Sequence, residues 1–382
     1  MTQARHERPP RVFFVINGLG TGGGEVHMVY LAAGLAELGY EVTIAALRLV
    51  RLDLTPLREA GVRVLVFGAE GPVAKLRKLP LLIRLARRAD VVGASLFDAT
   101  LWGRLAAIAA RRPAVIIEHT PGRELATSRR GKSRARWVAL HNRLLDPFTH
   151  TVVAVARWQV PILLREGVAE RKVRVIPNGV AVDELRRQAA TGVSRADLGI
   201  PDDAKLLVHV ARFMPQKNQP MTLEVVRRLR ADLGDVHVIF AGAGDLLPDV
   251  QAQAEAMGAR EWAHFLGRRR DVPRLLHLAD VFVLPSFAEA MPVAILEALA
   301  VGVPVVATDV ADVRPILELT GGGIAIPPGD TDAFEQACRR LLTERQLHER
   351  LAGAAVHGAR RHYDHRRMVG NYASVLDAAA GD

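Results

Sequence analysis

Short apolar runs rich in β-branched residues alternate with amphipathic stretches of helical length along almost the whole chain. This pattern predicts an α/β fold of parallel sheets with helices on both faces. The expected strands of the first series are Arg11–Ile16, Glu41–Leu47, Val62–Phe67, Asp90–Gly93, Ala114–Glu118 and Thr151–Val155. Those of the second series are Lys205–Val210, Val236–Ala241, Ala263–Leu266, Val281–Pro285 and Pro304–Thr308.

The alternation is interrupted near Ile176-Pro-Asn-Gly-Val180 and in the polar stretch that follows. We therefore expect two doubly wound, Rossmann-like domains, residues 1–180 and 181–361, with a cleft between them. Periodic segments such as Val26–Leu38 and Met221–Leu233 are expected helices. The last part of the chain, residues 362–382, contains one more helix candidate, His362–Ala379.

Composition restricts the class of protein. Nearly half of the 382 residues are apolar, which is enough for two cores. The single cysteine, Cys338, excludes an internal disulfide and fits a reducing compartment. The N-terminal residues lack the apolar stretch of a signal peptide, and no apolar run reaches the ~18 residues of a transmembrane helix. The expectation is a soluble cytoplasmic protein.

The charge is concentrated in the first half of the chain. Residues 1–180 hold 28 Lys and Arg against 14 Asp and Glu, a net charge of +14, whereas the remaining residues hold 23 and 27, a net charge of −4. Such asymmetry indicates an anionic ligand, a nucleic acid or a membrane surface as partner of the first domain. No nucleic-acid-binding motif accompanies the charge, so we expect no nucleic acid.

The most informative segment runs from Leu284 to Pro304 and contains two glutamates, Glu289 and Glu297. It has the pattern of a buried strand, a tight loop with the first acid and a helix with the second. Pro292 suits the first helical position. Helix N-termini bind anions, so the start of this helix is a candidate phosphate site. An acid on each side of that site suits a sugar nucleotide, because one carboxylate can accept hydrogen bonds from the sugar hydroxyls and the other from the ribose.

A glycine-rich loop, Asn17-Gly-Leu-Gly-Thr-Gly-Gly-Gly-Glu25, follows the first strand. Such a loop lets the backbone approach phosphates closely, although it could also be a flexible turn. Its glycines match the dinucleotide-binding fingerprint G-x-G-x-x-G. The second strand ends in Ala45-Ala-Leu-Arg48 rather than in an acid, which disfavours NAD and leaves NADP open.

Two cations, Arg212 and Lys217, follow the strand Lys205–Val210. At the carboxyl edge of a parallel sheet they are well placed to hold a diphosphate and to stabilise the charge on it as it leaves. Without the glutamate segment they would be interpreted as solvated loop residues.

Together these motifs resemble glycosyltransferase family 4, the retaining enzymes of GT-B fold that use nucleotide sugars. The resemblance covers almost the whole chain. It rests on the glycine-rich loop with Glu25, Val175–Val180, the Arg212/Lys217 pair, Phe265-Leu-Gly267, Ala279–Ser286, the two glutamates and Gly302–Ala307.

The resemblance implies roles for individual residues. Arg212 and Lys217 would grip the donor diphosphate, Glu297 would bind the ribose, and Glu289 and His119 would contact the donor sugar. The remaining donor contacts it implies are Gly22, Gly23, Leu266, Gly267, Arg268, Ala290, Met291, Pro292 and Val293. It further implies a UDP- or GDP-linked donor, no cofactor, no metal and a C-terminal helix that crosses back to the first domain.

The chain departs from the family pattern at three places where glycine is common: Ala211, Ala290 and Ala311-Asp312. These departures leave the donor pose open and motivate a non-catalytic, glycan-binding alternative. Two further alternatives are a sugar-nucleotide epimerase of the same fold and an NADP-dependent oxidoreductase. The last would leave Arg212, Lys217 and both glutamates without a role.

Two basic stretches of the first domain suit an anionic membrane face: Lys75–Arg88, with apolar residues near helical spacing, and a run that ends in a tryptophan. The predicted membrane or acceptor contacts in that run are Arg129, Arg130, Lys132, Arg134 and Trp137. The equally open alternative is a sheet-covering helix and a solvated loop. The family resemblance implies a glycan or lipid-linked acceptor, polysaccharide or glycoconjugate assembly, and peripheral contact with the inner face of the plasma membrane.

Overall fold

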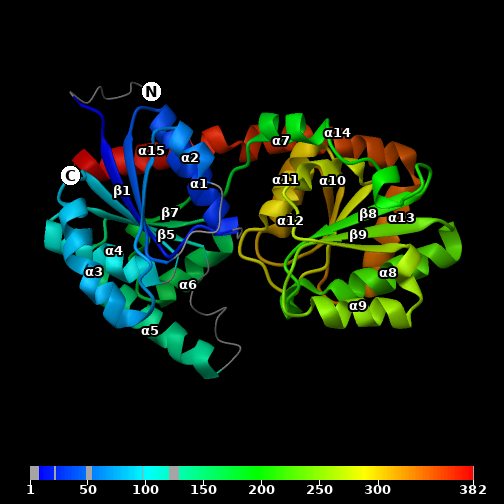
Figure 1. The fold of residues 1–382 in the computed structure, drawn as a ribbon, viewed down its shortest axis with the longest axis horizontal. Coiled ribbons are helices and arrows are strands. Elements are labelled where there is room, and N and C mark those ends of the chain that lie inside the picture. The colour runs from blue at the N-terminus through cyan, green and yellow to red at the C-terminus, as the bar shows by residue number, and fades with distance from the viewer. Residues whose placement is uncertain (1–7, 21–22, 49–53, 97, 120–128, 382) are drawn as a thin grey trace. The chain divides into compact units, whose positions relative to one another are not determined.

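The computed structural model describes residues 8–20, 23–48, 54–96, 98–119 and 129–381, with the side chains of 129–135 left out. The chain divides into two compact units. Unit 1 comprises Met1–Gly179 and His365–Asp382, and unit 2 comprises Val180–Asp364 (Figure 1). These limits differ by a few residues from the boundaries expected from the sequence.

Unit 1 is built on a seven-stranded parallel sheet in the order β3-β2-β1-β4-β5-β6-β7. Its strands are β1 Arg11–Ile16, β2 Glu41–Ala46, β3 Arg63–Val66, β4 Val91–Ser95, β5 Ala114–Glu118, β6 Thr151–Ala154 and β7 Val173–Val175. Its helices are α1 Gly23–Glu37, α2 Thr55–Glu59, α3 Gly71–Ala86, α4 Asp98–Ala110, α5 Arg129–Leu145, α6 Val160–Arg165 and α15 His365–Gly381. Right-handed crossovers place helices on both faces: α1 packs against α15, and α3 packs against α4.

Unit 2 is built on a six-stranded parallel sheet in the order β10-β9-β8-β11-β12-β13. Its strands are β8 Lys205–Val210, β9 Val236–Ala241, β10 Ala263–Gly267, β11 Val281–Leu284, β12 Val305–Thr308 and β13 Gly323–Ile326. Its helices are α7 Val182–Ala189, α8 Gln219–Leu233, α9 Leu247–Ala256, α10 Val272–Leu278, α11 Val293–Val301, α12 Val313–Thr320, α13 Thr331–Thr343 and α14 Arg345–Tyr363.

The strands form because their apolar runs are buried on both faces. All residues of β9 and β11 are buried, as are those of β4, β6 and β12. Parallel strands covered on both sides have this near-continuous apolar pattern. The core of unit 2 joins β8 and β9 to α8, α9 and α13, and one core of unit 1 joins β1 and β2 to α3 and α4.

One expected element is wrong in its bounds. The sequence predicted a single helix over His362–Ala379, but α14 ends at Tyr363, Asp364 is extended and α15 begins at His365. Val180 bridges to Asp364, and its N–H donates to the carbonyl of Tyr363 at 2.8 Å. A long-range bridge therefore interrupts the helical pattern where the chain leaves unit 2. The last helix, α15, is part of unit 1.

Among the described residues, no helix combines the length and the apolar character that a membrane span requires.

Candidate active site

In unit 2 the predicted phosphate and sugar residues follow two neighbouring strands. Strands β8 and β11 pair directly, and the chain continues from them in opposite directions, to β9 on one side and to β12 on the other. Ligands of open α/β sheets bind at the carboxyl ends of strands at such a switch point. The loop after β8 carries Arg212 and Lys217, and the loop after β11 carries Glu289.

Glu289 is held by three hydrogen bonds. The ammonium group of Lys217 donates to both of its carboxylate oxygens, at 2.6 and 2.7 Å, and the Ser286 hydroxyl donates to Oε1 at 2.6 Å. The residue is only 8% exposed. Charge-assisted hydrogen bonds of this length are among the strong ones in proteins. Two of the predicted site residues, Lys217 and Glu289, are thus in direct contact.

A second layer of hydroxyl groups supports Glu289. Ser286 and Thr308 are fully buried, and the Thr308 hydroxyl donates to the backbone carbonyl of Ser286. Sequence reasoning did not single out either residue. The available signal was topological: Thr308 ends β12, which pairs with β11, so its side chain reaches the loop that carries the glutamate.

Arg212 presents an exposed guanidinium. Within the described residues its side chain has no hydrogen bond or ion pair, while its carbonyl accepts a hydrogen bond from the Gln219 side chain at 2.9 Å. The N–H of Phe287 donates to the carbonyl of Gln216 at 2.7 Å, which ties the β11 loop to the β8 loop. The backbone is thus fixed while the cation stays available to an anionic ligand.

Glu297 lies on α11, whose first turn points its N–H groups toward the same edge of the sheet. Pro292 is the residue before the helix rather than its first position, which corrects the sequence prediction by one residue. Its ψ of 96° is extended, so the helix can begin only at Val293. The Glu297 carboxyl makes no hydrogen bond or ion pair among the described residues, and burial raises its pKa to about 7.

This pKa predicts a pH effect on stability. In the unfolded chain the carboxyl ionises near its model-peptide value of 4.5, whereas in the folded protein it stays protonated up to about 7. The folded state binds more protons in that window, so the free energy of unfolding falls as pH rises from 4.5 to 7. Glu297→Gln should remove this loss and unfold at a higher temperature than the wild type at pH 8.

The measurement is thermal unfolding between pH 5 and pH 8, with Glu318→Gln as the control because Glu318 is an exposed helix acid of the same unit. Equal pH dependence in Glu297→Gln and the wild type would contradict the assigned burial.

Unit 1 has its own switch point, between β1 and β4. The Asn17 side chain, after β1, accepts a hydrogen bond from the N–H of Ala99 at 3.1 Å and so links the two strand ends. Leu96, directly after β4, has a φ of +71°, a conformation that costs a non-glycine residue energy and that is common at functional sites. Gly22 lies outside the described residues, and Gly23 is the first residue of α1.

His119 follows β5 and packs against the start of α1. A Cβ atom at Gly24 would lie 3.1 Å from its ring, a tight contact that the ring could relieve only by shifting by a few tenths of an ångström. The His27 ring lies edge-on at 4.9 Å, and the carbonyl of His119 accepts a hydrogen bond from Gln159 at 2.9 Å. Burial lowers the pKa of His119 to about 4, which leaves its imidazole neutral at physiological pH.

Three buried polar side chains that sequence reasoning did not single out lie together near His119. His27, Asn178 and Tyr372 are each at most 3% exposed, and the Tyr372 ring lies 5.4 Å from that of His27. Burial, followed by electrostatic repulsion between the protonated forms of His27 and His119, lowers the pKa of His27 well below its usual value. His27 lies on α1 and Tyr372 lies on α15, while Asn178 lies near Gly179, where the first chain segment of unit 1 ends. Only the folded unit brings these three side chains together.

The other predicted donor and membrane contacts lie on several elements of the two units. Leu266 and Gly267 end β10, where Gly267 has a φ of +62°, and Arg268 is exposed just beyond them. Ala290, Met291 and Pro292 connect Glu289 to α11, and Val293 begins that helix. Ala311, where the family commonly has glycine, has a φ of +53°, which glycine adopts more easily. Trp137 is 46% exposed on α5, whereas the side chains of Arg129, Arg130, Lys132 and Arg134 lie outside the described residues.

Two structural facts bear on the alternatives. Arg48, the cation that an NADP phosphate would require, lies 3.7 Å from the carboxylate of Asp98 and is thus already opposite an acid. Within the described parts of the chain, no cluster of three or more His, Cys, Asp or Glu residues could hold a metal ion.

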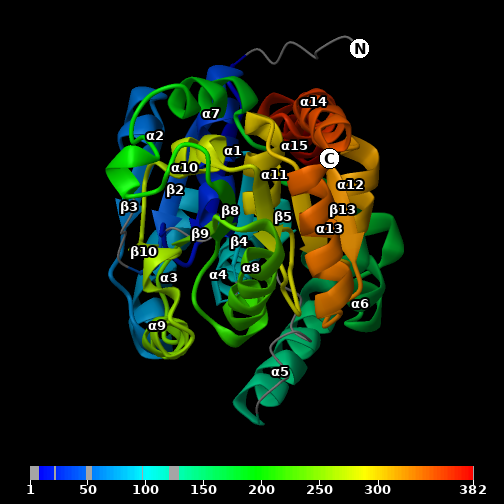
Figure 2. The same cartoon turned by 90° about the vertical axis from the view of Figure 1, so that its right-hand side faces the viewer.

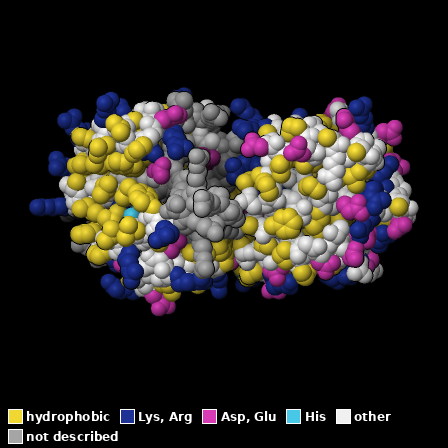
Figure 3. Space-filling model, turned by 90° about the horizontal axis from the view of Figure 1, so that it is seen from below, with side chains coloured by type: hydrophobic (Ala, Val, Ile, Leu, Met, Phe, Trp, Pro, Cys, Tyr) yellow, Lys and Arg dark blue, Asp and Glu magenta, His cyan; other side chains and the backbone are white. Residues whose placement is uncertain are grey.

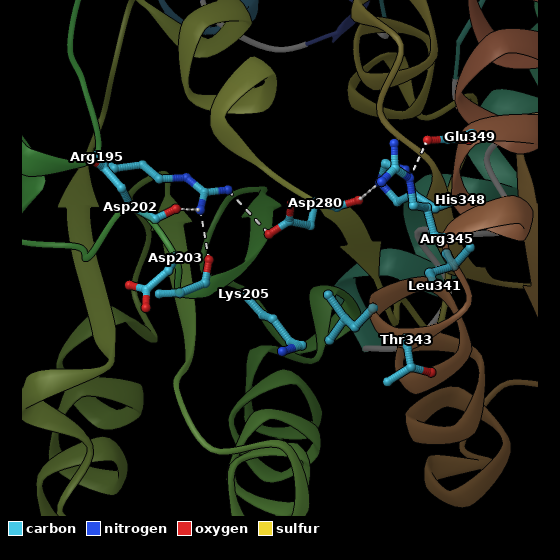
Figure 4. Close-up of a pocket in the computed structure, with 12 residues that line it drawn as sticks. Arg195, Asp202, Asp203, Lys205, Asp280, Leu341, Thr343, Arg345, His348 and Glu349 are labelled. Carbon is cyan, nitrogen blue, oxygen red and sulfur yellow. Dashed lines mark hydrogen bonds and ion pairs between the residues drawn. The ribbon is translucent and has the colours of Figure 1, made fainter.

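A pocket of about 480 Å³ lies elsewhere in unit 2 (Figure 4). Lys205 begins β8 and Asp280 precedes β11, so this pocket is at the amino-terminal edge of the sheet, opposite the switch-point loops. Arg195 donates to the Asp280 carboxylate and to three backbone carbonyls there, and His348 bonds the carbonyl of Asp280 at 2.9 Å. Because these groups satisfy one another, we assign the pocket a structural role.

Two protein-family models match this chain. Residues 192–357 match the family described as glycosyl transferases group 1, and residues 21–184 match glycosyltransferase family 4. The chain is 27% identical to the phosphatidyl-myo-inositol mannosyltransferase of Mycobacterium leprae, over 94% of each protein. It is 29% identical to the D-inositol 3-phosphate glycosyltransferase of Geodermatophilus obscurus, over 95% of this chain and 86% of that protein.

Solved structures share the fold. A crystal structure of Anabaena HepE in complex with UDP and glucose superimposes with a TM-score of 0.83 at 20% identity, covering 97% of this chain and all of that one. The crystal structure of WaaG, a glycosyltransferase involved in lipopolysaccharide biosynthesis, gives a TM-score of 0.75 at 18% identity, over 96% of this chain and 99% of that one. At this level of identity the likeness concerns the fold, which is GT-B.

Proposed function

Because the chain belongs to the group 1 glycosyltransferases of family 4, with the GT-B fold, we propose that it transfers a sugar, with retention, from a nucleoside-diphosphate sugar to a hydroxyl group of a glycan or lipid-linked acceptor. The observation that carries the proposal is the Arg212, Lys217 and Glu289 group at the switch point of unit 2. Relatives named as a mannosyltransferase and a galactosyltransferase of lipid-linked acceptors support glycoconjugate assembly.

The proposed chemistry needs little from the protein beyond placement and charge. Arg212 and Lys217 bind the diphosphate and stabilise the negative charge that grows on it as the C1–O bond breaks. The acceptor hydroxyl attacks C1 on the face that the diphosphate leaves, and its proton passes to the departing phosphate. Glu289 orients the donor sugar by accepting hydrogen bonds from its hydroxyl groups, and Glu297 accepts them from the ribose.

In unit 1, the proposed donor contacts are His119 and the glycine-rich loop. The neutral imidazole of His119 can hydrogen-bond a sugar hydroxyl, and Gly23 and Gly24, the end of the loop, form the first turn of α1, whose N–H groups can bind an anion. No cofactor and no metal are part of the proposal. An anionic membrane surface is proposed as a further partner of unit 1, on the inner face of the plasma membrane, because the positive charge of the chain is concentrated in its first 180 residues.

Nucleotide titration tests the proposal directly. We expect micromolar binding of UDP or GDP by calorimetry in the presence of EDTA, and we expect Arg212→Ala to weaken it by about tenfold to a hundredfold, since one cation on a diphosphate is removed. Arg260→Ala is the matched control, because Arg260 pairs with Glu255 before β10, at the other edge of the sheet.

Binding of NADPH, with no affinity for nucleoside diphosphates, would instead favour the oxidoreductase alternative. Binding of a nucleoside diphosphate without any transfer or hydrolysis of its sugar conjugates would favour the glycan-binding alternative.

A further inference from the structure

Exposed large hydrophobic side chains are concentrated in unit 1. Of the thirteen that the described residues contain, only Phe287 and Leu319 belong to unit 2. Figure 3 shows hydrophobic side chains gathered on unit 1, on the side where α3 and α5 lie in Figure 1, with Lys and Arg around them. Concentrated apolar exposure of this kind marks an interaction surface rather than scattered surface residues.

The clearest part of this surface lies on α5 and the turn that follows it. The exposed fractions are 46% for Trp137, 55% for Leu140, 63% for Leu144 and 58% for Phe148. With 3.6 residues per turn, Trp137, Leu140 and Leu144 fall within about 60° of one another around the helix. They form one continuous apolar stripe, which we call the α5 stripe together with Phe148.

The opposite face of α5 is firmly attached to unit 1. Asn142 is buried and accepts a hydrogen bond from the fully buried Arg104 at 2.7 Å, and it donates to Glu166 at 3.1 Å. Arg104 also donates to the Thr149 hydroxyl at 3.1 Å. The helix is therefore amphipathic across its axis: the polar network faces inward, and the apolar stripe faces away from the unit. Figure 2 shows α5 projecting beyond the other elements of unit 1.

The charge around the stripe is of one sign. The sequence of α5 contains six basic residues and no acid. Arg136 and Arg143 are exposed, and helical geometry places both about 40–60° beyond Leu140, along one border of the stripe. An apolar stripe with a tryptophan and a basic border is the pattern of a helix that lies in the interface of an anionic bilayer.

We propose that the α5 stripe inserts into the headgroup region of an anionic bilayer while Arg136 and Arg143 pair with lipid phosphates. A second copy of the chain is a poorer occupant, because two stripes face to face would bring their basic borders together. This inference rests on the membrane partner proposed above but not on the transfer reaction. Because the α5 stripe is apolar, its contact with the bilayer does not depend on charge alone. A fraction of the membrane binding should therefore persist at high salt, where surface charge is screened.

Vesicle sedimentation tests the proposal with the full chain. We expect binding to vesicles of phosphatidylcholine with phosphatidylglycerol, and weak binding to phosphatidylcholine alone. Leu140→Ser with Leu144→Ser should reduce the affinity at least tenfold at any salt concentration, because two large apolar groups no longer leave water. Arg136→Gln with Arg143→Gln should reduce it about tenfold at low salt and much less at 0.5 M salt.

Leu319→Ser is the matched control, since Leu319 is 52% exposed on unit 2, and it should bind vesicles like the wild type. Nucleotide affinity, measured by calorimetry, should be unchanged in all variants, which separates a failed surface from a failed fold or a failed donor site. Equal vesicle binding by the serine double variant and the wild type would overturn the proposal. So would a dimer in solution that the serine double variant disrupts, since the stripe would then be covered by a second copy.

Discussion

Replacing Glu289 by Gln should lower turnover by about a hundredfold to a thousandfold while nucleotide binding is largely kept. The substitution preserves the size of the side chain but removes the charge that Lys217 contacts at 2.6 and 2.7 Å. An amide also presents a donor where the carboxylate presents only acceptors, so sugar hydroxyls lose a fixed partner. Removal of one pre-organised polar group from an active site typically costs this much in turnover.

Two further variants separate orientation from charge. Ser286→Ala removes only the hydrogen bond to Oε1, so we expect a smaller loss, about threefold to tenfold, with the Lys217 pair intact. Lys217→Met should weaken both nucleotide binding and turnover, because that cation is proposed to serve both. The measurement is the initial rate of sugar transfer or of donor hydrolysis. Turnover by Glu289→Gln within threefold of the wild type would remove Glu289 from the proposed mechanism.

The periodicity of the sequence predicted eleven of the thirteen strands in the described part of the chain, because buried parallel strands have unbroken apolar runs. The two that it missed are edge strands with weak local signals. β7, Val173–Val175, has an arginine at its centre and only three residues, and β13, Gly323–Ile326, begins with a glycine. Both form because a neighbouring strand already presents a row of free backbone groups, which no local pattern reveals.

In the candidate site, too, some residues could be predicted from the sequence and others could not. Arg212, Lys217 and Glu289 could be predicted because charged residues directly after strands of a doubly wound sheet converge at its carboxyl edge. Thr308 could not, since its contact with Ser286 depends on the register of β11 with β12. The raised pKa of Glu297 was equally out of reach, because it depends on what surrounds the carboxyl after folding.

Gly242→Ala should be among the most damaging single substitutions in unit 2. Gly242 follows β9 with a φ of +153°, and a Cβ atom there would lie 1.8 Å from the carbonyl oxygen of Ala211. Its N–H donates to the carbonyl of Gly267 at 2.7 Å, so it lies between the loop of Arg212 and the segment of the predicted donor contacts Leu266–Arg268. Since both neighbours are backbone, the alanine variant can fold only if these loops separate. We expect nucleotide affinity to fall at least tenfold and the unfolding temperature to drop by several degrees.

Gly353→Ala is the control for this prediction. Gly353 lies within α14, where an added Cβ would meet no atom within 4 Å, so alanine should leave affinity unchanged and raise stability by up to about 1 kcal/mol. Comparing the two variants separates the general effect of replacing a glycine from the specific effect of a Cβ atom against the Ala211 carbonyl. Normal UDP or GDP affinity in a folded Gly242→Ala variant would mean that the two loops can separate without disturbing Arg212. In that case the spacing of these loops would not be what positions the diphosphate-binding cation.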